Sequence, residues 1–278
     1  MVITNDAALL VFVPETILFF WRQGRREWIL PALIFETVAA NLGSMALPMG
    51  NPQNLFLYFT YHLAPAAFLS MTVPFAGAAC LLLAGGLFLY PDAAVTASEN
   101  TVPLLKKEGA AAAVLFVVVI LAVLRLLPWE AALTATLVVG GLFARKALLA
   151  VDFHLLFLFA FLFAGVGNLQ HLPFLSDWAA SFVTGHEMTA AIVLSQIISN
   201  VPAAVLLAEY TDEAGALVIG TNLGGLGTLI ASMASLITWR LYGKVPGADK
   251  VRYIRVFTLW NILFLVILWG MAILMQRL

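Results

Sequence analysis

The feature that most constrains this chain is a series of apolar stretches long enough to cross a membrane. A transmembrane helix needs about 20 mostly apolar residues. Hydrophobic residues make up 63% of the 278 residues and charged residues 10%, whereas soluble domains carry about 25% charged residues. So few charges cannot cover a water-facing surface, and the sequence therefore predicts an all-α polytopic membrane protein. Membrane segments are expected at 6–20, 28–64, 67–90, 109–127, 130–144, 153–167, 187–208, 213–239 and 256–276.

The basic residues predict how these segments are oriented. If the segments alternate, and 187–208 enters and leaves on one side, then 12 of the 14 Lys and Arg residues share the side of loop 21–27. Only Arg125 and Arg277 fall on the other side. Positive charge concentrates in cytoplasmic loops. We therefore expect a multi-pass protein of a bacterial-type plasma (inner) membrane, with a re-entrant hairpin at 187–208 and the C-terminus outside.

Two pairs of unusual segments recur in the same order and indicate an internal repeat. Thr4-Asn5 and Ser199-Asn200 each precede an apolar helix, and the Asn-Leu-Gly runs at 41–43 and 222–224 each interrupt a hydrophobic stretch. The charge map gives the two copies opposite orientations. Inverted repeats with re-entrant hairpins and discontinuous transmembrane helices place a site near the bilayer midplane. The predicted half-repeats are 1–90 (the remainder of the first) and 109–278, joined by a cytoplasmic linker at 91–108.

The chemistry expected at these breaks is the binding of ions. Broken helices expose N-termini, whose free N–H groups attract anions. Free carbonyls and side-chain oxygens can coordinate a hard cation such as Na⁺. No Lys or Arg lies deep in a predicted span, so an anion would depend on dipoles, amides and bound cations. The expected substrate- and ion-binding residues are Thr4, Asn5, Asp6, Asn41, Gly43, Ser44, Pro48, Ser199, Asn200, Pro202, Asn222, Gly224, Gly225, Gly227 and Thr228.

Asp6 and Glu36 are the acids expected nearest the midplane, where carboxylates are costly and usually functional. Asp6 could bind a cation, carry a proton or cap the following helix. Glu36 could act in coupling or form a hydrogen bond to a neighbouring helix. The chain has one cysteine, no metal-ligand cluster and no HExxH or GxSxG motif, so we expect no cofactor, no metal site and no enzyme. Its net charge of −1 argues against a nucleic-acid partner.

Four stretches resemble the ion transporter superfamily, most closely its citrate-transporter-like and arsenite/sodium–proton antiporter-like branches. They are ITNDAALLVFVP, NLGSMALPMGNPQN, SQIISNVPAAVLL and GTNLGGLGTLIASMASLI. The resemblance implies secondary active transport of a small anion, citrate- or dicarboxylate-like or an oxyanion, coupled to Na⁺ or H⁺. It also implies a homodimer formed by scaffold helices and a transport domain that moves as an elevator. The alternatives are a cation–proton antiporter or an arsenite-type efflux carrier.

The chain departs from this family at its N-terminus. Family members carry several spans and the first hairpin arm before the first motif, which begins here at residue 3. By comparison with the second half-repeat, we expect about 90 residues to be missing. A mis-called start codon or a true truncation would each explain this, and a true truncation would leave a non-transporting remnant.

Overall fold

The structure is a computed structural model that describes residues 4–90, 106–143, 145–149, 157, 160–161, 164–165, 168 and 182–276. Every regular element in these ranges is helical, which confirms the predicted all-α fold. The chain divides into two compact units. The first comprises Met1–Val95 and Phe163–Leu278, and the second is Thr96–Leu162.

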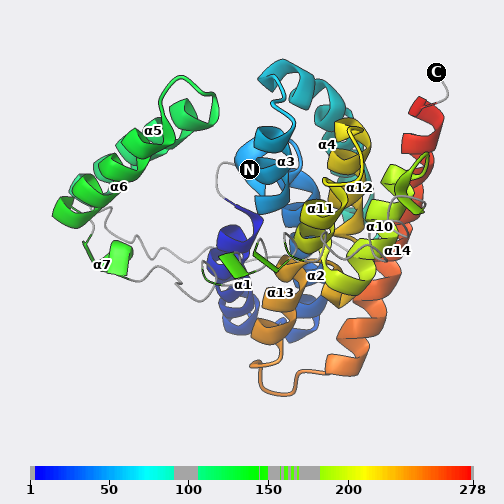
Figure 1. Cartoon of the computed structure of the whole chain (residues 1–278). Coiled ribbons are helices and arrows are strands. Elements are labelled where there is room, and N and C mark those ends of the chain that lie inside the picture. Colours follow the sequence, from blue (N-terminus) through cyan, green and yellow to red (C-terminus); the bar gives the residue numbers. More distant parts are fainter. Residues whose placement is uncertain are drawn as a thin grey trace. The chain divides into compact units, whose positions relative to one another are not determined.

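The first unit contains most of the described helices (Figure 1). Three short 3₁₀ turns interrupt or join them, at η1 (Arg26–Trp28), η2 (Pro48–Gly50) and η3 (Leu229–Ala231). The α-helices are α1 (Asn5–Arg22), α2 (Ile29–Ser44), α3 (Pro52–Thr60), α4 (Pro65–Leu87), α10 (Glu187–Ile198), α11 (Asn200–Leu207), α12 (Ala214–Gly224), α13 (Met233–Tyr242) and α14 (Lys250–Gln276).

The second unit contains α5 (Lys106–Val123), α6 (Trp129–Phe143) and the short α7 (Arg145–Leu149). Helices α5 and α6 pack side by side as two consecutive apolar helices (Figure 1), at the positions of the predicted segments 109–127 and 130–144. Most of segment 153–167 and most of linker 91–108 lie outside the described residues.

Within the described residues, α4 and α14 are long and apolar enough to cross a membrane as single helices. They correspond to the predicted segments 67–90 and 256–276, although α14 begins earlier, at Lys250. Other apolar helices in the described residues are shorter, and two of them, α10 and α12, end where a hydrophobic stretch is interrupted.

Both interrupted stretches contain the predicted break, but each break begins a few residues after the asparagine at which it was expected. Helix α2 ends at Ser44 and the next long helix starts at Pro52, whereas α12 ends at Gly224 and α13 starts at Met233. Asn41 and Asn222 therefore lie in the last turns of helices, not in the breaks themselves. The predicted hairpin at 187–208 forms two helices, α10 and α11, that pack against each other and meet at Ser199. Its entry and exit on one side of a membrane stays a prediction.

Helices α2 and α14 contribute to both hydrophobic clusters of the first unit. One cluster joins α2, α4, α10, α12 and α14, and includes Leu42, Phe75 and Leu268. The other joins α1, α2, α13 and α14 around Leu33 and Phe257. Helix α1 packs against α13, and α11 packs against α3. In both pairs, a helix of one predicted half-repeat packs against a helix of the other. This is the packing expected of two equivalent half-repeats, and their inverted orientation stays a prediction.

Candidate functional site

The centre of the first unit is built from the two helix breaks, which hold each other through side chains. Asn51 precedes α3, and its Nδ2 donates to Asn222 Oδ1 of α12 at 2.9 Å. Ser232 precedes α13, and its hydroxyl donates to Asn41 Oδ1 of α2 at 3.0 Å. All four side chains are buried. Each half-helix that follows a break is thus fixed at its first turn by an asparagine of the other broken helix.

Asn51 and Ser232 are also the N-caps of those half-helices. Asn51 Oδ1 accepts from the Asn54 backbone N–H at 2.9 Å, and Ser232 Oγ accepts from the Ala234 N–H at 3.2 Å. Capping by a side-chain oxygen satisfies a backbone donor that the first helical turn leaves free. Because the same side chains also reach across to the other helix, the caps fix both the backbone and the packing of the two breaks.

The repeated dipeptides Thr4-Asn5 and Ser199-Asn200 are here called the first and second tips, and the first tip lies at the start of α1. Thr4 caps the helix by accepting from the Ala7 N–H at 3.4 Å. Asn5 is buried, and its Nδ2 donates to Asn41 Oδ1 at 3.3 Å. Asp6 is 9% exposed. Its buried Oδ1 has no hydrogen-bond partner among the described residues.

The second tip, Ser199-Asn200, lies at the start of α11. Ser199 adopts φ +75°, a backbone conformation typical of glycine, and its hydroxyl donates to the Ala231 carbonyl at 3.4 Å. Asn200 is buried. A β-carbon at Gly225 would come within 2.9 Å of Asn200 Nδ2, so the tip lies directly against the break after α12. Pro202 is half-buried in the first turn of α11.

Asn41 connects the two tips to each other. Besides accepting from Asn5 and Ser232, it donates from Nδ2 to the Gly225 carbonyl at 3.5 Å. The Asn200 amide lies against the same Gly225. The four asparagines of the predicted repeat motifs therefore belong to one contact network. Asn5 donates to Asn41, and Asn41 and Asn200 both lie at Gly225. Asn222 is connected to Asn41 through Asn51 and Ser44.

Helix α12 packs unusually close to α10 because Gly220 and Gly224 have no side chains. A β-carbon at Gly224 would lie 2.5 Å from Ser195 Oγ, and one at Gly220 would lie 2.7 Å from the Met188 carbonyl oxygen. Small residues four apart allow membrane helices to approach in this way. Gly227 has φ +105° in the following break.

The remaining residues that were predicted to bind substrate or ions lie around this central group of polar side chains. Ser44 donates to the Asn41 carbonyl at 2.8 Å and accepts from Asn51 at 3.2 Å. Gly43 is half-buried in α2, and Pro48 is buried at the first position of η2. Thr228 is exposed at the edge.

Glu36 lies apart from the central group. Its carboxylate is hydrogen-bonded to Thr16, where α2 packs against α1, but its buried Oε2, like Asp6 Oδ1, has no partner among the described residues. No hydrogen bond between described residues joins it to the two tips. A hydrogen bond to a neighbouring helix was one of the two alternatives predicted for this acid.

Sequence reasoning did not select four polar side chains that complete the group. Asn51 and Asn54 were inside the predicted break but were not chosen, and Ser232 directly precedes a helix start. Gln196 of α10 donates to the carbonyls of Gly224 and Leu226, both at 2.9 Å, and accepts from the Thr228 N–H at 2.9 Å. The sequence feature that could have identified them is an amide or hydroxyl side chain in an otherwise apolar segment next to a break.

The electrostatics of the group favour small ions. Four helices begin at the central residues: α1, α3, α11 and α13. Helix N-termini carry partial positive charge and free N–H groups. Every Lys and Arg whose side chain is described is exposed, so in that part of the chain Asp6 has no buried basic neighbour. The group therefore offers amides and dipoles to an anion, and one carboxylate to a cation.

Comparison with known proteins places these observations in a family. The sequence model of the citrate transporter family (CitMHS) matches residues 1–237. The chain is 32% identical to "Uncharacterized transporter MJ0456" of Methanocaldococcus jannaschii over 240 residues, which cover 86% of this chain and 66% of that protein. It is 34% identical to "Inner membrane protein YbiR" of Escherichia coli K12 over 252 residues, which cover 86% of this chain and 65% of that protein.

The chain thus spans about two thirds of the length of the curated relatives it matches. The matched region contains both tips and both breaks described above. The family match, the relatives and the apolar helices together indicate an integral membrane protein. The chain belongs to the citrate transporter family.

Proposed function

We propose that this chain carries the binding site of a secondary active transporter for a small anion, either citrate- or dicarboxylate-like or an oxyanion. The observation that carries the proposal is the meeting of four helix starts with the amides of Asn5, Asn41, Asn200 and Asn222. Amide donors and helix dipoles hold carboxylates without a buried Arg or Lys. The description of the matched family, citrate transporter, supports this substrate class.

Asp6 is the residue proposed to bind the coupling ion. A buried carboxylate without a basic partner is expensive in a membrane. Binding of H⁺ or Na⁺ would neutralise it, and Na⁺ could also use nearby oxygens such as the carbonyls freed at the breaks. Asp6 directly follows Asn5, which contacts Asn41. A cation at Asp6 would therefore lie beside the proposed anion site, so that each ion favours binding of the other.

The division into units supports an elevator-type movement. Every proposed binding residue lies in the first unit, and the second unit, Thr96–Leu162, contains none of them. A compact unit with its own hydrophobic clusters can move as one body. We propose that the first unit carries the bound ions and that the second belongs to a scaffold through which two copies form a homodimer.

Transport by the purified chain in proteoliposomes tests the proposal. Labelled citrate, succinate, sulfate and arsenite are offered with an inward Na⁺ gradient, an inward H⁺ gradient or neither. The expected result is gradient-dependent uptake of at least one of these substrates. Uptake of none of them above that of empty vesicles, under either gradient, would contradict the proposal.

A second candidate function is cation–proton antiport or arsenite-type efflux, and the observation that favours it is the unpartnered Asp6 carboxylate. In the antiport case the carboxylate binds H⁺ and the transported cation alternately. Exchange would then depend on a pH gradient but not on a co-transported carboxylate. Quenching of a pH-sensitive dye inside vesicles, measured on addition of Na⁺ or K⁺, separates this function from anion symport.

A further inference from the structure

Glu36 of α2 is an acid that the ion site proposed above does not use. Its carboxylate is hydrogen-bonded to Thr16 of α1 through one oxygen, whereas Oε2 is buried and has no partner among the described residues. An ionised carboxylate within a membrane segment is costly. A proton on Oε2 removes that charge.

The described residues place no charged group where it would stabilise the ionised form of Glu36. The ion pair between described side chains joins Arg25 to Glu27. Helices α4 and α12, which pack against α2, contain no acidic or basic residue. Asp6 lies about 15 Å earlier than Thr16 along α1, at about 1.5 Å per residue. The other charged residues on the elements packed against α2 are exposed, namely Glu15, Arg22, Arg26, Glu27, Arg240, Lys250, Arg252 and Arg255.

Hydroxyl groups from the neighbouring helices gather beside this acid. Thr37 directly follows Glu36, and its Oγ1 lies 2.9 Å from Thr238 Oγ1 of α13. Tyr253 of α14 lies beside Thr37 and interacts electrostatically with Glu36. Tyr253 is fully buried, and its hydroxyl has no hydrogen bond of good geometry among the described residues. Because a phenol hydroxyl can donate one proton while it accepts another, Tyr253 is suited to exchange a proton with Glu36.

Tyr242 connects Tyr253 to the loop between α13 and α14. The two rings stack with their centres 4.9 Å apart. Tyr242 is buried, and its hydroxyl accepts from the Asp249 backbone N–H at 3.2 Å. Asp249 is exposed. The two tyrosines therefore lead from an exposed loop to the hydroxyl groups beside Glu36.

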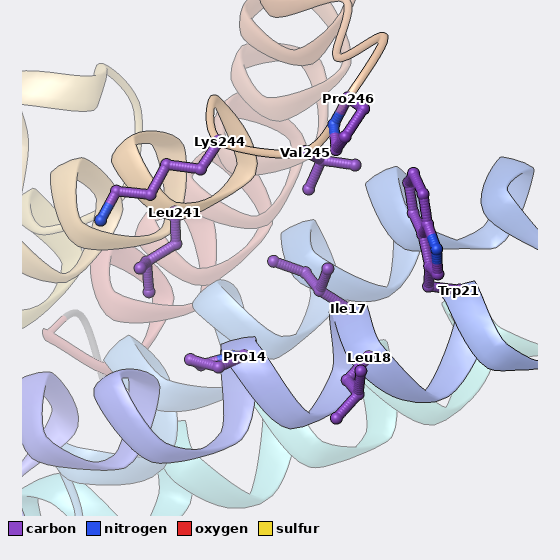
Figure 2. A pocket seen from close by; sticks show the side chains of 8 residues that line it. All are labelled: Pro14, Ile17, Leu18, Trp21, Leu241, Lys244, Val245 and Pro246. Carbon is purple, nitrogen blue, oxygen red and sulfur yellow. The ribbon is translucent and has the colours of Figure 1, made fainter.

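The groove between α1 and the end of α13 does not provide this connection. It has a volume of about 520 Å³ and is lined by apolar side chains and Lys244 (Figure 2). Neither Glu36 nor Tyr253 lines it. The following lining residues pack against the hydrophobic cluster that contains both tyrosines: Ile17, Trp21, Leu241 and Val245. The tyrosines are thus covered by apolar side chains on this face, and their polar connection runs to Asp249.

We propose that Glu36 is a proton-binding site, separate from the ion site at Asp6, and that Tyr253 and Tyr242 connect it to water at the α13–α14 loop. Tyr253 gives its hydroxyl proton to Glu36 Oε2 and takes one from Tyr242, which takes one from water at the loop. A hard metal cation needs several oxygen ligands, whereas Glu36 offers one oxygen without a partner. The bound proton neutralises the acid where α2 packs against α1, the two helices that carry Asn41 and Asn5.

Infrared difference spectroscopy of the full chain in detergent tests the proton site. The starting protein is Asp6→Asn, which lacks the acid proposed to bind the coupling ion. We expect the C=O band of a protonated carboxyl at neutral pH, and its loss when Glu36→Gln is added. Glu15→Gln in the same starting protein is the matched control, because Glu15 is an exposed acid next to Thr16; it should leave the band unchanged. Absence of the band in Asp6→Asn, or a band that Glu36→Gln does not alter, would overturn the proposal.

The rate of proton release tests the two tyrosines. After a jump to alkaline pH, the carboxyl band should decay about 100-fold more slowly in Tyr253→Phe, the loss typical when a positioned proton-transfer group is removed. Tyr58→Phe is the control, because Tyr58 is a fully buried tyrosine of α3 that packs against Phe68. Thermal unfolding verifies that each variant is folded. Equal decay in the two variants would overturn the tyrosine route. Since no substrate or gradient is present, these outcomes are independent of the proteoliposome assay.

Discussion

Asn51 Nδ2 donates to Asn222 Oδ1 at 2.9 Å across 171 residues of sequence, and so joins the start of α3 to the last turn of α12. Ser232 and Asn41 form the corresponding pair in the other direction, 191 residues apart. The two breaks therefore support each other. A substitution in one break should therefore also alter the structure of the other break.

Replacing Asn51 by alanine should destabilise the first unit. The change removes the α3 cap and leaves Asn222 Oδ1 without its donor in a buried site. Loss of a cap costs about 1 kcal/mol, and an unsatisfied buried polar atom costs about 1–3 kcal/mol more. We expect a lower thermal midpoint in detergent and weaker stabilisation by added citrate. Thr60→Ala, at an exposed position of the same helix, should change neither.

Replacing Gly224 by valine should separate α10 from α12. Even the β-carbon would overlap Ser195, and neighbouring backbone of α10 leaves no room for it to move. Overpacking of this kind costs about 1–3 kcal/mol. Gly85→Val in α4 is the control, since nothing lies within 4 Å of its β-carbon position. Equal thermal midpoints for the two variants would show that the α10–α12 contact is looser than described.

Replacing Gln196 by methionine tests the backbone of the second break. Methionine keeps the length of the side chain but removes the bonds to Gly224, Leu226 and Thr228. We expect faster hydrogen exchange of the amides at 225–228 and a loss of anion affinity of about ten-fold, from hydrogen bonds worth about 1 kcal/mol each. Val193→Ala, at an exposed position of the same helix, should leave both unchanged. Unchanged exchange in the Gln196 variant would mean that the break holds its shape without it.

Much of the fold could be predicted because its signals are local. Runs of apolar residues mark α1, α4, α5, α6 and α14, and Pro48 with Pro52 marks the first break. Proline at the first position of a helix is favourable, whereas within a helix it removes a donor. The exact ends of α2 and α12 could not be predicted in this way. Asn41 and Asn222 remain helical because distant partners satisfy their side chains.

The candidate site was only partly predictable for a similar reason. Asn5 and Asn200 repeat a visible motif, and the inverted repeat predicted from that motif placed both residues beside the breaks. Gln196 and Ser232 repeat nothing, and their importance comes from carbonyl and amide groups that lie 28 or more residues away in the sequence. The packing of α1 against α13 joins two segments that lie more than 200 residues apart in the sequence. No pattern within either segment indicates that contact.

Asp6→Asn should remove the dependence of transport on the coupling ion. The substitution keeps the size of the side chain but removes the charge and the titratable proton. If Asp6 binds H⁺ or Na⁺, uptake by the variant should no longer respond to the corresponding gradient, whereas passive exchange of bound anion should persist. Initial rates of labelled anion uptake, measured from pH 5 to pH 8 with and without Na⁺, provide the test.

Glu15→Gln is the matched control for Asp6→Asn, because Glu15 is an exposed acid on the same helix α1. It loses the same charge without affecting the buried site. We therefore expect Glu15→Gln to keep the gradient dependence of the unmodified chain. If both variants respond to the gradient as the unmodified chain does, the coupling ion binds elsewhere. Glu36, which is half-buried and hydrogen-bonded to Thr16, then becomes the next acid to replace. If only Asp6→Asn loses the response, the unpartnered carboxylate beside Asn5 is the residue that couples the two ions.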